Sequence, residues 1–294
     1  MKGDFFYMKS MCIKSNNKYI IDYLLKEFSN INLDCVYISN NCFKIYNNVI
    51  IHYSGDNIDN FYKILCDILT KCILFFYEKR LTKNIISYNY FYFNDIETKQ
   101  ILDSCIDLFN SDSNIYNEKY KTIYNSVYSY IIEHHSIVLN GFVNFRLKSY
   151  KEILDYNIDL CVNNFLIEKE YYEFINILHL YVNSKESIVN TIHLLYVNKE
   201  SILMDDNKNI IQIQDNIFDA KYLSDISFSA NDYCLNTLLN LLPEKLNIHL
   251  IDNYEDEFIT TLKLIFENRV TVCNDCDICR VYRFTNNVVT NNIK

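Results

Sequence analysis

Residues 243–273, PEKLNIHLIDNYEDEFITTLKLIFENRVTVC, are the stretch that decides the fold of the C-terminal third of the chain. Apolar residues alternate from Lys245 to Leu250, follow helical spacing from Glu255 to Asn268, and form a short β-rich run from Arg269 to Cys273. A strand, a helix and a second strand in this order predict a βαβ crossover. Its two strands are then parallel and its connection is right-handed.

A cluster of three cysteines follows the second predicted strand directly. Cys273, Cys276 and Cys279 form two overlapping C-x-x-C spacings, which place three thiols within reach of one metal ion or cluster. A closed Cys₄ site needs one more ligand, and no further cysteine follows. The fourth ligand must therefore come from elsewhere in the chain.

His249 is the best-placed fourth ligand. Its strand presents alternate apolar residues (Leu246, Ile248 and Leu250) to one face, so that His249 faces the other side. The same alternation in the partner strand turns Cys273 away from the face of its valines. Parallel strands that end together would bring the two side chains to one edge. We therefore predict a metal site at His249, Cys273, Cys276 and Cys279, with zinc or an iron–sulfur cluster as the bound group.

Two other interpretations of the cysteines stay open. Cysteine is often a small buried hydrophobe, and we expect that role for the remaining eight: Cys12, Cys35, Cys42, Cys66, Cys72, Cys105, Cys161 and Cys234. A C-x-x-C after a strand also suits dithiol redox chemistry, if a helix N-terminus lowers the pKa of one thiol.

The rest of the chain predicts an α+β protein in three parts and a tail. Residues 1–55 form a small α/β unit, with strands over 5–13, 33–38, 42–46 and 49–53 and a helix over 16–28. Asn47-Asn48 suits the tight turn between the last two strands.

Residues 56–186 have helical periodicity and contain a long helix pair within 141–182. We expect Asp56 to cap the first helix and residues 110–117 to form a loop. Residues 187–284 form the C-terminal α/β unit, with antiparallel strands over 188–197, 201–204 and 209–213 and a helix ending at Pro243. Residues 285–294 are a polar tail.

Composition bounds the function. The net charge of −9 argues against a broad phosphate-binding surface, so no nucleic-acid partner is expected. The most apolar stretch, 64–77, is interrupted by Asp67 and Lys71, which predicts no membrane span. The start lacks a secretion signal, and the odd number of 11 cysteines suggests reduced thiols. We expect a cytoplasmic protein.

Glycine is too scarce for a phosphate-binding loop, since the chain has 3 glycines and they lie far apart. No nucleophile elbow or zincin helix is present either. No residue is therefore assigned a catalytic or cofactor-binding role.

Five further residues are candidates for a structural or partner-binding role: Gly141, Arg146, Glu168, Glu170 and Glu173. The residue usage indicates an AT-rich genome, in which glycine and arginine are retained where they are needed, as at Gly141 and Arg146. Glu170 and Glu173 lie one helical turn apart and are expected to form an ion pair with Arg146, which we interpret as a partly buried anchor.

Four stretches together resemble one family. They are GFVNFRLKSY at 141–150, EKEYYEFI at 168–175, PEKLNIH at 243–249, and IFENRV at 265–270 followed by the three cysteines. As a set and in this order they are similar to motifs of the YtxC family, sporulation proteins of spore-forming Firmicutes. The similarity spans Gly141 to Cys279, and residues 1–140 contribute no matching motif.

The resemblance implies a role in endospore formation and brings no established reaction. We favour a non-enzymatic protein that binds another protein and contains a structural metal site. The alternative is a metal- or thiol-dependent redox enzyme that uses the cysteine cluster.

Overall fold

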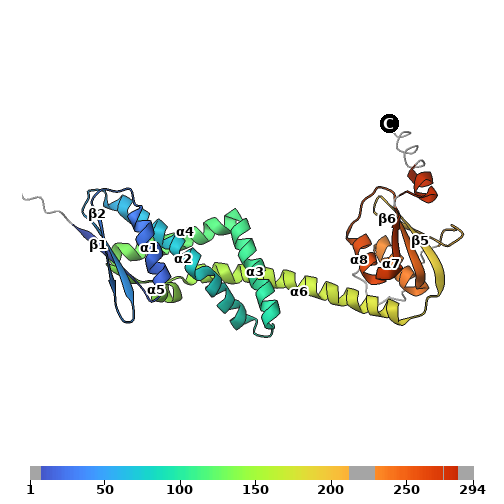
Figure 1. Ribbon diagram of the computed structural model, residues 1–294, viewed down its shortest axis with the longest axis horizontal. Coiled ribbons are helices and arrows are strands. Elements are labelled where there is room, and N and C mark those ends of the chain that lie inside the picture. Colours follow the sequence, from blue (N-terminus) through green and yellow to red (C-terminus); the bar gives the residue numbers. More distant parts are fainter. Residues whose placement is uncertain (1–7, 212–228, 274, 284–294) are drawn as a thin grey trace, which may run out of the picture. The chain divides into compact units, whose positions relative to one another are not determined.

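The computed structural model of the 294-residue chain describes residues 8–211, 229–273 and 275–283. The chain divides into two compact units, Met1–Leu166 and Ile167–Lys294, and the division falls within helix α6 (Lys148–Ser184). Each unit combines a four-stranded mixed sheet with helices (Figure 1), which confirms the predicted α+β class. None of the described helices is long and apolar enough to cross a membrane.

The sheet of the first unit has the order β2-β3-β1-β4, in which β1 is antiparallel to β3 and parallel to β4. Its strands are β1 (Lys9–Ser15), β2 (Val36–Cys42), β3 (Asn47–Tyr53) and β4 (Ser136–Val138). Alternate residues of β1 and β3, such as Ile13 and Ile51, are buried against the helices. This alternation is the period of two that a half-buried strand requires.

The predicted strand at 42–46 and the turn at Asn47-Asn48 are wrong. Asn47 and Asn48 belong to β3, where they pair with Cys42 and Asn41, and the chain reverses over residues 43–46 instead. The Asn48 side-chain oxygen accepts a hydrogen bond from the Asn41 backbone N–H at 3.1 Å. Backbone pairing thus extends β2 through a polar segment that lacks the apolar alternation of a strand.

The helices of the first unit are α1 (Lys18–Ser29), α2 (Ile58–Asn89), α3 (Asp95–Ser111), α4 (Ser113–Glu133), α5 (Leu139–Arg146) and the first half of α6. Asn57, rather than the predicted Asp56, caps α2. The predicted loop at 110–117 is also wrong, since only Asp112 separates α3 from α4. Its carboxylate accepts the Asn114 backbone N–H at 2.7 Å and so starts the next helix at once.

The periodic region at 141–182 is interrupted at Leu147. The backbone of Leu147 leaves the helical conformation (φ −98°, ψ 51°), while its side chain remains buried. A buried leucine at this position fits the helical spacing of apolar residues whether or not the helix is broken there. The spacing therefore could not predict the break at Leu147. A single hydrophobic core joins strand residues such as Ile13 to helix residues such as Phe61 and Leu154.

The sheet of the second unit has the order β6-β5-β7-β8. Its strands are β5 (Val189–Val197), β6 (Glu200–Met204), β7 (Pro243–Leu250) and β8 (Val270–Cys273). β6 is antiparallel to β5, whereas β5, β7 and β8 are mutually parallel neighbours. Helix α8 (Glu257–Phe266) and the 3₁₀ turn η1 (Glu267–Arg269) connect β7 to β8, so the predicted βαβ order and its parallel strands are confirmed.

The strand predicted at 209–213 is not formed as a ladder within the described residues. Ile210 makes a single bridge to Met204, and residues 212 and 213 lie outside the described part of the chain. Between Met204 and Ile210, the Asp205 carboxylate accepts a hydrogen bond from the backbone N–H of Asn209 at 2.8 Å, which closes the turn.

The two faces of this sheet are unlike. The second half of α6, α7 (Ala230–Leu241) and α8 pack on one face through residues such as Leu238, Leu262 and Ile248. On the other face a small cluster joins Leu195, Met204 and Ile251 to Cys279. The cysteine cluster therefore lies on the sheet face opposite these helices.

Candidate metal centre

His249 and Cys273 are direct partners in the register of β7 and β8. Leu246 and Ile248, which alternate with His249, are buried in the helix-covered core. His249 therefore projects from the opposite face, and Cys273 projects beside it because partners in adjacent strands share a face. The parity of the two strands, together with their register, positions the first two side chains of the site.

Cys276 and Cys279 are positioned by a short helical segment, residues 277–283, that follows β8. The backbone N–H of Arg280 donates to the Cys276 carbonyl at 2.9 Å, so the two thiols lie about one helical turn apart on the same side. The Arg283 guanidinium donates to the Ile251 carbonyl at 3.1 Å, which ties the segment to the end of β7.

The four side chains converge. One ligand atom from each of His249, Cys273, Cys276 and Cys279 lies within 4.8 Å of every other. His249 Nδ1 lies 3.3 Å from Cys276 Sγ and 3.5 Å from Cys279 Sγ, and the two sulfurs are 3.6 Å apart. A tetrahedral zinc ion, with bonds of about 2.3 Å to sulfur and 2.0 Å to nitrogen, separates its ligands by roughly 3.5–3.8 Å.

Burial and hydrogen bonding set the protonation of these groups. Burial, with a smaller contribution from nearby His193, lowers the pKa of His249 to about 4, so the imidazole is neutral and able to ligate. Burial opposes ionisation of Cys276, but hydrogen bonds from the Cys279 backbone and from neighbouring thiols outweigh it and lower the Cys276 pKa. Burial raises the pKa of Cys279 to about 11.

His193 on β5 is a residue of this site that the sequence did not indicate. Its Nδ1 lies 2.9 Å from His249 Nε2, and the two rings stack with centroids 5.2 Å apart. When His249 Nδ1 faces the sulfurs as an acceptor, its Nε2 carries the proton. That N–H then donates a hydrogen bond to His193 Nδ1. The sequence could not show this contact. Alternation predicts on which face of its strand His193 lies, but it does not predict that this strand lies beside β7.

Comparison with known proteins places the chain in a family. It matches the sequence model of the YtxC-like family over residues 63–271, which is most of its length. The chain belongs to the YtxC-like family. No curated protein and no solved structure shows a significant match.

The YtxC-like match begins earlier in the chain, and also ends earlier, than the motifs indicated. It begins at Lys63, within a region where no motif was found, and includes His249 and His193. It ends at Thr271, two residues before the first of the three cysteines. The cysteine cluster therefore follows the segment matched to the YtxC-like family.

The other candidate residues of this YtxC-like protein lie away from the cluster. Gly141 and Arg146 belong to α5 in the first unit, whereas Glu168, Glu170 and Glu173 lie on α6 in the second. The predicted ion pair between Arg146 and these glutamates stays a prediction. Glu173 lies 3.9 Å from Lys169, which is a weak surface pair.

Three expectations about individual residues are wrong. Arg146 is exposed rather than partly buried, and its guanidinium lies over the Tyr130 ring at 6.0 Å. A Cβ at Gly141 would meet nothing within 4 Å, so packing does not require glycine there. Of the eight other cysteines, Cys35 precedes and Cys42 ends β2, the edge strand of its sheet, and both are exposed. Cys12 is half-buried, so the expected burial is wrong for these three cysteines.

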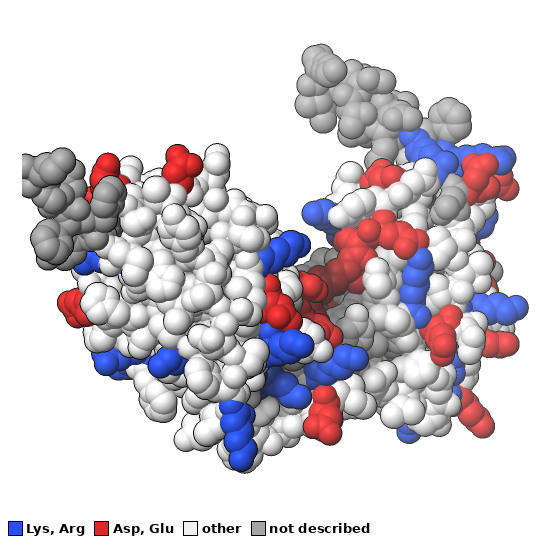
Figure 2. Space-filling view, turned by 60° about the vertical axis from the view of Figure 1, so that its left-hand side comes forward, with Lys and Arg blue, Asp and Glu red and all other residues white. Residues whose placement is uncertain are grey.

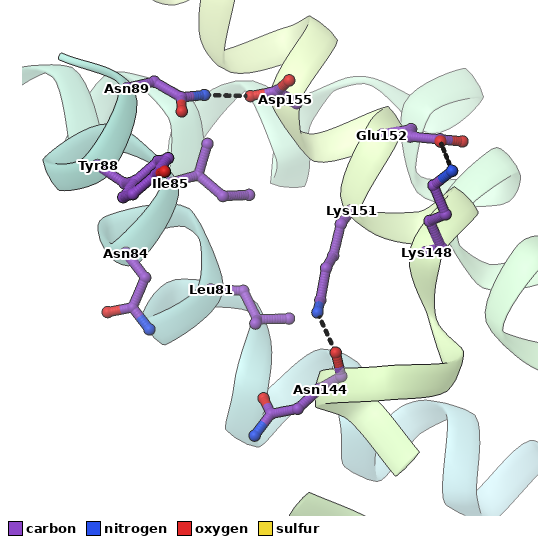
Figure 3. Close-up of a pocket in the computed structure, with 10 residues that line it drawn as sticks. All are labelled: Leu81, Asn84, Ile85, Tyr88, Asn89, Asn144, Lys148, Lys151, Glu152 and Asp155. Atoms are coloured by element: carbon purple, nitrogen blue, oxygen red, sulfur yellow. Dashed lines mark hydrogen bonds and ion pairs between the residues drawn. The ribbon is translucent and has the colours of Figure 1, made fainter. Parts of the chain in front are cut away.

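A pocket of about 560 Å³ lies between α2, α5 and α6 in the first unit (Figure 3). Its charged groups have neighbours as partners: Lys148 pairs with Glu152, Lys151 donates to the Asn144 carbonyl, and Asn89 donates to Asp155 at 2.7 Å. The four charged side chains that line the pocket are therefore already paired.

Proposed function

We propose that this YtxC-like protein is a sporulation-associated, non-enzymatic, partner-binding protein whose C-terminal unit contains a structural zinc ion. The observation that carries the metal site is the convergence of His249, Cys273, Cys276 and Cys279 within 4.8 Å. The support for sporulation is membership of the YtxC-like family together with the motifs of the sequence.

The donor set favours a structural ion. One imidazole and three thiolates complete a tetrahedral shell, whereas catalytic zinc sites retain an open position for water or substrate. His249 is 3% exposed and Cys279 is 0% exposed, whereas Cys273 and Cys276 are half-buried, so the shell is closed on the side of the sheet. In a four-iron cluster each thiolate binds a different iron and the sulfurs stand farther apart, so the short separations favour a single ion over such a cluster.

The ion would fasten the C-terminal segment to the sheet. Only a few apolar side chains, such as Ile278 and Tyr282, support residues 277–283 on this face. Bonds from one ion to β7, β8 and this segment would add the free energy that such a small cluster cannot supply.

A protein partner suits the surface better than nucleic acid does. On the face drawn in Figure 2, Lys and Arg side chains lie among Asp and Glu side chains, and the chain has a net charge of −9. Such a mixture gives little of the continuous positive potential that phosphate backbones select.

Elemental analysis of the full chain, purified without added metal, tests the site. We expect about one zinc per chain, lost in Cys276→Ser and retained in Cys42→Ser, which replaces an exposed cysteine outside the cluster. Cobalt substituted for zinc should give the visible absorption of tetrahedral thiolate coordination. Chain without bound metal, or with iron and its own visible absorption, would contradict the zinc proposal.

One observation favours the thiol-redox alternative. Cys276 and Cys279 lie 3.6 Å apart with the pKa of Cys276 lowered, as in a dithiol that can close to a disulfide. The same preparation distinguishes the two functions, because a metal-free protein in which this pair oxidises reversibly would support the redox enzyme.

A further inference from the structure

Arginine is rare in this chain, which has five arginines among its 28 basic residues. Four of them donate hydrogen bonds from the guanidinium to oxygen atoms of the protein: Arg80, Arg269, Arg280 and Arg283. Arg146 differs, since within the described residues of the first unit it forms no hydrogen bond and no ion pair. Its five N–H donors are presented to the surroundings.

These donors lie beside a small polar pocket of about 250 Å³ between α4 and α5. Its wall is a stack of rings: His134 lies parallel to Tyr130 at 4.2 Å, and Phe142 meets Tyr130 edge-on at 5.1 Å. The Arg146 guanidinium lies over the same Tyr130 ring. At this distance the guanidinium is at the outer limit of cation–π contact, and its charge lies beside the pocket.

Two serines and a glutamate supply acceptors to the pocket. The hydroxyls of Ser126 and Ser129 donate to carbonyls of their own helix, so their lone pairs face the pocket. The exposed Glu133 carboxylate is a further acceptor. The Glu133 carboxylate repels a phosphate group, with a charge of about −1.5 to −2, more strongly than a singly charged carboxylate. A peptide also offers N–H donors to these acceptors.

We propose that this pocket binds an acidic segment of a partner protein. A partner carboxylate forms a bidentate pair with Arg146, and the adjacent peptide N–H groups donate to Glu133 and Ser129. Phe145 is 84% exposed next to Arg146 and supplies an apolar contact for a neighbouring side chain. This inference rests on the partner-binding part of the proposed function and names the surface that performs it.

Nuclear magnetic resonance of the arginine side chains tests it in the full chain, because only five Nε–Hε signals are expected. The probe is a short synthetic peptide of alternating Glu and Phe, and its control is the same peptide with Gln in place of Glu. We expect the Arg146 signal, assigned by its loss in Arg146→Lys, to shift saturably with the Glu peptide alone. Arg146→Ala should weaken binding about tenfold or more, and Arg80→Lys should not.

Two results overturn the inference. The first is an Arg146 signal that moves no more than that of Arg80, and the second is an equal response to inorganic phosphate, which would indicate a small-anion site. The zinc content of the same samples reports on the metal proposal separately. Zinc-loaded protein that ignores the peptide removes only this inference, whereas zinc-free protein that binds it removes only the metal site.

Discussion

At the scale of single residues, the two histidines on neighbouring parallel strands show how one side chain prepares another. His249 is held by its hydrogen bond to His193 so that Nδ1, and not Nε2, faces the three sulfurs. Outer partners of this kind fix the ring orientation and the tautomer of a metal-bound histidine.

Replacing His193 should therefore weaken zinc binding without removing a ligand. We expect His193→Leu to lower the affinity for zinc by about 10–100-fold, measured by competition with a chromophoric chelator. His135→Leu, at an exposed position in the first unit, is the matched control and should leave the affinity unchanged. Equal affinities for His193→Leu and the unmodified chain would show that His193 does not position the ligand.

Arg269 acts at the same scale in a structural role. One of its terminal nitrogens donates to the Pro243 carbonyl at 3.1 Å and the other to the Val182 carbonyl at 2.9 Å. It thereby joins the end of α6 to the first residue of β7 and satisfies carbonyls that a helix end leaves unpaired. A lysine cannot reach two carbonyls with a planar fork, which explains an arginine at this position.

At the scale of elements, the parallel pair β7 and β8 determines where the cluster forms, and the segment at 277–283 closes it. This segment packs through few apolar side chains and is joined to β7 by Arg283. Its attachment should therefore depend on the ion far more than the attachment of the strands does.

Chelation tests this dependence directly. In the zinc-loaded chain, we expect a strong chelator to accelerate amide hydrogen exchange in residues 275–283, while β7 keeps its protection. The reason is that β7 has hydrogen-bonded neighbours on both sides, β5 and β8. Mass-resolved exchange before and after chelation measures both segments in one sample, and unchanged exchange at 275–283 would contradict the proposed role of the ion.

At the scale of the whole molecule, buried thiols couple stability to pH. Burial raises the pKa of Cys66, Cys72 and Cys234 to about 12 in the folded chain, from an ordinary value of 9.0. Between these values the folded state retains protons that the unfolded chain has released. The contribution of these thiols is therefore fully present below pH 9 and is lost as the pH rises toward 12.

We expect the free energy of unfolding, measured by urea titration followed by circular dichroism, to fall steadily above pH 9. Cys72→Ala removes one of these thiols and should make that fall shallower, even though the variant is less stable at neutral pH. Cys42→Ser, in which an exposed thiol is replaced, should keep the original slope. A slope that Cys72→Ala leaves unchanged would exclude a contribution from the buried thiol.

Local pattern accounts for much of what the sequence determined. Alternation in 245–250 and helical spacing in 255–268 predicted the βαβ unit, because strand and helix periods are set by neighbours along the chain. The same alternation predicted that His249 and Cys273 share a face, since parity does not depend on distant contacts. Errors occurred where strand pairing overrode local pattern, as in the polar extension of β2, and where a buried residue kept the helical period across a break, as at Leu147.

Only the tertiary structure decided which elements meet. The position of β5 beside β7 brings His193 to His249, and the contact of α5 with α4 presents Arg146 over Tyr130. Neither contact can be derived from one sequence, because strand order and helix packing depend on how distant apolar faces are buried together. The sequence by itself determined the candidate ligands, their spacing and their faces, and the fold decided that they converge.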